Sequence, residues 1–78
     1  MARTSIAAVQ AAVVKFVSNR LDEVGTVSFS EIRDHVTAAF PGAAFNWLTA
    51  VRAPMQSLIN AGNMKRTADV SAEVYVKL

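Results

Sequence analysis

The chain has 78 residues, of which 53% are hydrophobic and 18% are charged, with no cysteine and a net charge of +2. This length allows one small domain spanning residues 1–78, and the high apolar fraction excludes a disordered tail. The lack of cysteine excludes disulfides and thiolate metal sites and favours a reducing, cytoplasmic compartment. The small positive charge is compatible with nucleic-acid binding but does not diagnose it.

The first predicted element is a helix over residues 4–24, with Thr4 or Ser5 as its cap. It is too short and too interrupted by charge to cross a membrane. Its apolar residues recur at helical spacing, and they are Ile6, Val9, Val13, Phe16, Val17 and Leu21. Alanine and valine also lie on other sides. The helix could therefore pair with its equivalent in a second copy of the chain, or it could cover the two later helices.

A second helix is predicted over residues 29–40, after a short β-prone segment at residues 26–28. Ser28 and Glu31 have the spacing of a capping box, in which each side chain satisfies a backbone N–H of the other residue. The residues expected to face inward are Phe29, Ile32, Val36, Ala39 and Phe40. Pro41 ends the helix because the residue before a proline avoids the α conformation.

The segment 43–66 predicts a long amphipathic helix that begins at an Asn46 cap, ends before Gly62 and leads into a basic strand. Its predicted buried residues are Leu48, Val51, Met55, Leu58 and Ile59. Pro54 disrupts a regular helix. Either one helix kinks near Ala50, the alternative we favour, or a second helix starts near Ala53.

Two strands are predicted at the C-terminal end, over residues 63–67 and 72–78, with residues 68–71 as the tip of the hairpin. In the second strand Val74, Val76 and Leu78 alternate with Glu73, Tyr75 and Lys77, which is typical of a half-buried strand. The predicted fold class is therefore α+β: three helices, a short strand and a C-terminal β-hairpin.

This order of elements resembles the winged helix-turn-helix superfamily over nearly the whole chain. The segment VRAPMQSLINAGNMKR resembles the end of the recognition helix and the start of the wing in bacterial regulators of the MarR and GntR type. The matching positions are Arg52, Leu58, Gly62 and Lys65-Arg66. Pro54 and an aspartate at the hairpin tip depart from that pattern. The resemblance implies a DNA-binding regulator of transcription, of bacterial or phage origin, that commonly acts as a dimer.

A helix in the major groove of double-stranded DNA can read bases through arginine, asparagine and glutamine, and basic side chains beside it hold phosphates. The predicted DNA-binding residues are Asn46, Thr49, Arg52, Gln56, Asn60, Lys65, Arg66 and Arg33. The simpler interpretation is that these residues form an ordinary solvated surface. An alternative function is a protein-interaction module, such as a small phage protein that inhibits a host protein.

The remaining chemistry-bearing residues predict no catalysis, no cofactor and no metal site. His35 is the only histidine, and no cysteine or spaced acidic cluster accompanies it, so we expect a surface position. Trp47 could stack on a base or mark an interface, but we interpret it as a core residue.

Overall fold

The computed structural model describes residues 5–42, 44–67 and 73–78. Its elements in chain order are α1 (Ile6–Glu23), β1 (Thr26–Ser28), α2 (Phe29–Ala39), η1 (Leu48–Arg52), α3 (Ala53–Asn60), β2 (Met64–Arg66) and β3 (Val74–Lys77). Because η1 continues into α3, these elements make three helices and a three-stranded antiparallel sheet. The predicted α+β fold class with a C-terminal β2–β3 hairpin is confirmed.

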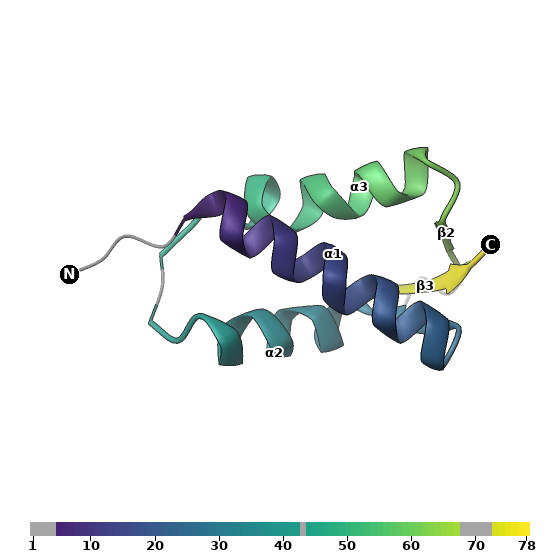
Figure 1. Ribbon diagram of the computed structural model, residues 1–78, viewed down its shortest axis with the longest axis horizontal. Helices are drawn as coiled ribbons and strands as arrows, with labels where there is room; N and C mark the ends of the chain where they lie inside the picture. The colour runs from purple at the N-terminus through teal and green to yellow at the C-terminus, as the bar shows by residue number, and fades with distance from the viewer. Residues whose placement is uncertain (1–4, 43, 68–72) are drawn as a thin grey trace.

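The first helix lies between the other two. Figure 1 shows α1 passing between α3 above and α2 below, with the sheet at the end where the C-terminus lies. In the sheet β3 is central and pairs antiparallel with β1 and with β2. Side chains from all three helices and all three strands form the core, and its buried residues are Val9, Val13, Val17, Leu21, Val27, Ile32, Val36, Ala50, Val51, Met55, Met64 and Tyr75. Within the described residues, no helix has the length and apolar character that crossing a bilayer requires.

Both predicted helix caps are confirmed. Ser5 Oγ accepts a hydrogen bond from the Ala8 N–H at 3.4 Å at the start of α1. At the start of α2, Ser28 Oγ accepts from the Glu31 N–H at 3.2 Å, and Glu31 Oε1 accepts from the Ser28 N–H at 3.2 Å. Arg20 of α1 extends this capping box, because its Nη2 lies 2.7 Å from Glu31 Oε2. Local sequence signals therefore fix where α1 and α2 begin.

The third helix contains one wide turn that its sequence explains. In η1 the Ala53 N–H donates to the carbonyl of Leu48, five residues earlier, instead of to Thr49. Pro54 favours this π-helical turn, because proline has no N–H to donate and its ring collides with the carbonyl four residues before it in a regular α-helix. The Thr49 carbonyl accepts a 2.9 Å hydrogen bond from Gln10 Nε2 of α1 instead. The helix is not split before Ala53.

The wide turn corrects the predicted core of this helix. An extra residue in one turn rotates the preceding residues relative to α3, so the apolar stripe changes phase at η1. Leu48, predicted as buried, is 67% exposed, whereas Ala50 and Val51 are fully buried. Leu58 and Ile59 pack against the core only half-buried. On α2 a second correction applies, because Ala39 is exposed.

The central strand buries a different side chain from the valines that its alternation emphasises. Tyr75 is 5% exposed and pairs with Val27 of β1, while Val74 and Val76 are half-buried and Leu78 is 62% exposed. The tyrosine ring offers more apolar area than a valine and has a hydroxyl that finds a partner. The two hairpin strands are confirmed with shorter limits, and the predicted hairpin tip lies outside the described residues.

Candidate nucleic-acid interface

The third helix begins with a cap on its exposed side. Asn46 Oδ1 accepts hydrogen bonds from the Leu48 N–H at 2.9 Å and the Thr49 N–H at 3.4 Å, which confirms the predicted N-cap. The capping role occupies the amide oxygen of Asn46. Of the two groups that a bidentate contact to adenine needs, only the NH₂ group stays available for a ligand.

The outward side of η1 and α3 is polar and almost uncharged. Thr49, Gln56 and Asn60 are exposed there, and Gln56 Nε2 donates to Asn60 Oδ1 at 3.0 Å. This i, i+4 hydrogen bond orients both amides on one side of the helix. Arg52 is the only charged residue between Trp47 and Asn60. The predicted readers on this helix therefore share one accessible side.

Arg52 itself is held inside the protein by two groups. Its Nη1 and Nη2 donate to the two carboxylate oxygens of Glu73, at 2.8 and 3.2 Å. The guanidinium carbon lies 4.2 Å from the centroid of the Phe29 ring, a cation–π contact with the start of α2. Arg52 therefore links the third helix to α2 and to the residue before β3, while its side chain remains 43% exposed.

Glu73 and Tyr75 complete this cluster. Tyr75 Oη donates to Glu73 Oε2 at 2.6 Å. The hydrogen bonds from Arg52 lower the pKa of Glu73 from 4.5, against the opposing effect of burial, and the hydrogen bond from Tyr75 adds to them. Burial, together with the neighbouring Glu73 carboxylate, raises the pKa of Tyr75 to about 12. At neutral pH the cluster therefore contains a charged Arg52, a charged Glu73 and a neutral tyrosine.

Sequence reasoning did not assign Glu73 and Tyr75 to this site. Their i, i+2 spacing places them on one face of a strand, and that is the only local signal. Which arginine they meet depends on how the C-terminal strand packs against η1, 21 positions away in the sequence from Glu73 to Arg52.

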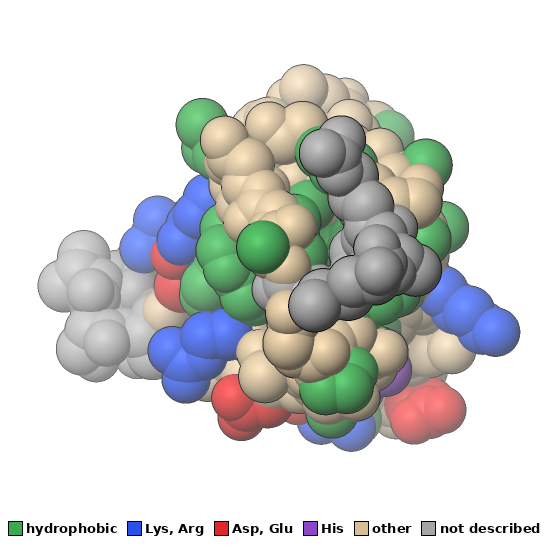
Figure 2. Space-filling model, turned by 90° about the vertical axis from the view of Figure 1, so that its left-hand side faces the viewer, with side chains coloured by type: hydrophobic (Ala, Val, Ile, Leu, Met, Phe, Trp, Pro, Cys, Tyr) green, Lys and Arg blue, Asp and Glu red, His purple; other side chains and the backbone are tan. Residues whose placement is uncertain are grey.

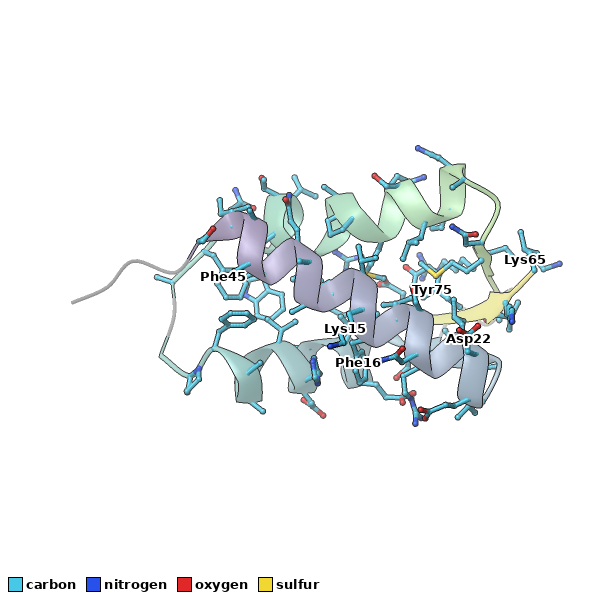
Figure 3. The ribbon with its side chains drawn as sticks, viewed as in Figure 1. Lys15, Phe16, Asp22, Phe45, Lys65 and Tyr75 are labelled. Atoms are coloured by element: carbon cyan, nitrogen blue, oxygen red, sulfur yellow. The ribbon has the colours of Figure 1, made fainter. Side chains whose placement is uncertain are left out.

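The basic residues of β2 lie next to this helix in the chain and in space. Lys65 and Arg66 are exposed, and Figure 3 shows Lys65 at the hairpin end of the molecule. Arg66 faces Tyr75 across the β2–β3 pair. Arg33 lies on α2, on the other side of α1 from α3, with Nε 3.7 Å from Asp34 Oδ1. The structure thus brings all the predicted site residues together except Arg33.

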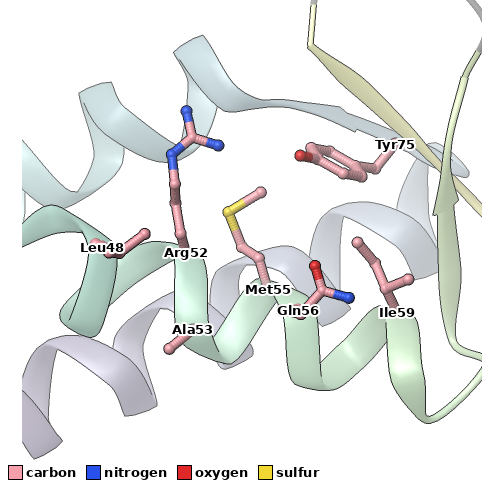
Figure 4. Close-up of a pocket in the computed structure, with 7 residues that line it drawn as sticks. All are labelled: Leu48, Arg52, Ala53, Met55, Gln56, Ile59 and Tyr75. Atoms are coloured by element: carbon pink, nitrogen blue, oxygen red, sulfur yellow. The ribbon is translucent and has the colours of Figure 1, made fainter.

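A hollow of about 320 Å³ separates the third helix from β3. Figure 4 shows Arg52 and Tyr75 extending toward it from opposite sides, with Met55 between them. Its lining residues are Leu48, Arg52, Ala53, Met55, Gln56, Ile59 and Tyr75. The Tyr75 hydroxyl and the Arg52 guanidinium are engaged by Glu73. The wall is therefore mainly apolar, with the Gln56 amide at its edge.

Charge is unevenly distributed over the molecule. Figure 2 shows charged side chains at the sides and the lower part of one end, while the uppermost surface, over η1 and α3, is hydrophobic or uncharged. The described acidic residues are Asp22, Glu23, Glu31, Asp34 and Glu73, and the first four belong to α1 and α2. Among the described residues of η1, α3 and β2 there is no carboxylate.

The two aromatic residues singled out from the sequence lie at the surface. Trp47 is 36% exposed, and its ring is tilted against Phe45 with the centroids 5.0 Å apart, so the core interpretation was wrong. His35 is exposed, as predicted, and stacks on Phe16 with centroids 4.2 Å apart. Among the described residues, no three His, Asp or Glu side chains converge on a common point that could hold a metal ion.

Comparison with protein-family models, curated proteins and solved structures found no match to this chain. The fold and the site are therefore interpreted from their own geometry. The order of three helices and three strands, with the sheet order β1-β3-β2, is compatible with a winged-helix topology.

Proposed function

We propose that this protein is a winged-helix, sequence-specific DNA-binding protein that acts in transcriptional regulation. The third helix enters the major groove, and β2 holds the phosphate backbone next to it. Occupancy of the site then excludes or recruits other proteins. The proposal extends the winged-helix resemblance of the sequence from fold to function.

One observation carries this proposal: the exposed side of η1 and α3 has hydrogen-bonding side chains and no carboxylate, and two exposed cations follow it in β2. DNA repels carboxylates and attracts lysine and arginine, so a DNA-binding face needs this charge pattern. Gln56 and Asn60 are residue types that pair with adenine, and Thr49 can contact either base type. The major groove is about 12 Å wide, which admits one α-helix.

In this arrangement Lys65 and Arg66 neutralise phosphates and set the register of the helix without reading sequence. Asn46 contributes through its free NH₂ group. Arg33 lies on α2, away from the helix that reads the bases, and its role is limited to a backbone contact at the edge of the interface.

Duplex binding by charge variants tests this function. A labelled random-sequence duplex is titrated with wild type and with the double variant Lys65→Gln/Arg66→Gln at increasing salt. We expect wild type to bind at low salt and the double variant to bind more weakly. Loss of two phosphate contacts makes the slope of log K against log salt shallower by about 1.8, at about 0.9 per contact.

Lys15→Gln is the matched control, because Lys15 is an exposed lysine of α1 outside the predicted site. It should leave the salt slope close to that of wild type. Failure of wild type to bind any duplex at low salt would remove the proposed function. Equal effects of the double variant and the control would show that binding follows net charge and not this face.

A second candidate function, protein binding, is favoured by an open groove between α1 and α3. It has a volume of about 630 Å³ and is lined by Ala7, Gln10, Ala11, Val14, Lys15, Ala53, Pro54 and Ser57. Small and apolar side chains with 38%-exposed Val14 beside them suit a packed helix, including α1 of a second copy. A concentration-dependent mass that Val14→Glu abolishes would support pairing through α1, and a monomer at high concentration would exclude it.

A further inference from the structure

Glu73 occupies the same donor groups of Arg52 that DNA would need. The two carboxylate oxygens of Glu73 accept from Nη1 and Nη2, so both arms of the guanidinium fork are engaged. A guanine edge or a phosphate presents the same arrangement, two acceptor atoms for two parallel N–H groups. Arg52 cannot donate this pair of hydrogen bonds to Glu73 and to DNA at the same time.

We propose that Glu73 is an internal competitor that holds Arg52 in the free protein and must be displaced when the third helix docks on DNA. The inference rests on the proposed function and deepens it by naming a specificity-determining residue. A site that offers Arg52 a bidentate acceptor compensates for the displaced carboxylate, and a site without one does not. Glu73 therefore weakens binding to all duplexes but weakens it most where no such acceptor is present.

The contacts of Glu73 suit exchange more than a permanent link. Arg52 is 43% exposed, and ion pairs at such positions contribute little net stability. When Arg52 leaves, Glu73 keeps the 2.6 Å hydrogen bond from the Tyr75 hydroxyl, so the carboxylate is not left without a partner. Arg66, which faces Tyr75 in the sheet, supplies a second cation nearby.

The stacking of Arg52 on Phe29 supports the same conclusion. The ring contacts the flat side of the guanidinium, with its centroid 4.2 Å from the guanidinium carbon, and leaves the N–H groups at the rim free to change partners. Arg52 is thereby held next to the outward side of the third helix in both states. Only its acceptor changes.

A double-mutant cycle tests the competitor. Duplex affinity is measured for wild type, Glu73→Gln, Arg52→Gln and the double variant, with a panel of random-sequence duplexes over a range of salt. We expect Glu73→Gln to bind about threefold more tightly, the scale of an exposed ion pair. Its salt slope becomes steeper by about 0.9, because one more cation reaches the DNA. In the Arg52→Gln background the gain from Glu73→Gln should vanish.

Glu31→Gln is the matched control, since Glu31 also binds an arginine but lies on α2. It should leave duplex affinity close to that of wild type. If Glu73→Gln binds as weakly as wild type or more weakly while wild type binds DNA, the competitor is overturned and the proposed function stands. A gain that persists without Arg52 also overturns it, because Glu73 would then act only through its charge. If neither wild type nor Glu73→Gln binds any duplex, the proposed function itself fails and the competitor with it.

A measurement on the unmutated protein covers the case in which Glu73→Gln does not fold. The carboxyl carbon of Glu73 and the side-chain N–H groups of Arg52 are followed by NMR as duplex is added to wild type. Loss of the Arg52 contact should shift both sets of signals together. A Glu73 signal that stays unchanged at saturation, with amide shifts elsewhere in the third helix, would overturn the competitor.

Discussion

Two arginine–glutamate pairs join distant parts of this chain, and their surroundings give them different roles. Arg20 of α1 contacts Glu31 of α2 with an N–O distance of 2.7 Å, and Arg52 of η1 contacts Glu73 with a distance of 2.8 Å. The first glutamate belongs to a helix cap. The second accepts a hydrogen bond from a tyrosine and lies beside the face that we propose binds DNA.

The difference lies in the charges around each pair. Asp22, Glu23 and Asp34 lie on the same two helices as the first pair and make that part of the surface mixed in charge. Near the second pair, the described residues of η1, α3 and β2 carry only cations. The same chemical pair therefore stabilises a helix junction in one region, and in the other it controls an arginine on a face suited to an anionic ligand.

The largest expected effect concerns the apolar support beneath Arg52. Met55 is 2% exposed, whereas Leu48, one turn earlier, is 67% exposed. We expect Met55→Ala to lower the free energy of unfolding by about 2–5 kcal/mol, because it removes a buried side chain and leaves a cavity. Leu48→Ala, the matched control, should cost less than about 0.5 kcal/mol. Urea denaturation measures both, and similar costs would contradict the change of phase at η1.

The next effect belongs to the capping region. Ser28→Ala removes the hydroxyl that accepts from the Glu31 N–H. It should cost about 1 kcal/mol of stability, as expected for loss of an N-cap. Ser30→Ala, two residues further along α2 at an exposed position, should leave stability nearly unchanged. Thermal unfolding compares the two. If the Ser28 variant is as stable as wild type, the cap does not stabilise α2.

A smaller effect distinguishes the two glutamates by titration. Tyr75 is the only tyrosine, so phenolate absorbance reports its pKa directly. Glu73→Gln should lower this pKa from about 12 toward 10.0, because the adjacent carboxylate no longer favours the neutral hydroxyl. Glu31→Gln should not change it. An unaltered tyrosine pKa in Glu73→Gln would mean that burial alone raises it.

The same group links stability to alkaline pH. The pKa of Tyr75 is raised in the folded protein, so its contribution is fully present below pH 10.0 and is lost as the pH rises through about 12. We expect this alkaline loss of stability to shrink in Glu73→Gln, in which the folded pKa lies closer to the unfolded value.

Local patterns explain why part of this structure could be predicted. The Ser28–Glu31 spacing defines the start of α2 because a capping box involves only neighbouring residues. The alternation after the hairpin predicts a strand. The exposure of Leu48 could not be predicted from spacing, because Pro54 changes the turn and Gln10 of another helix satisfies the freed carbonyl. The partner of Arg52 depends on tertiary packing in the same way.

The most direct test of the central claim is a map of amide chemical shifts as duplex DNA is added to the protein. The account predicts that the shifted amides concentrate in η1, α3 and β2, around Thr49, Gln56 and Lys65, and that the C-terminal half of α1 and α2 changes little. Shifts concentrated on α1 and α2, or no shifts at any duplex concentration at low salt, would contradict it.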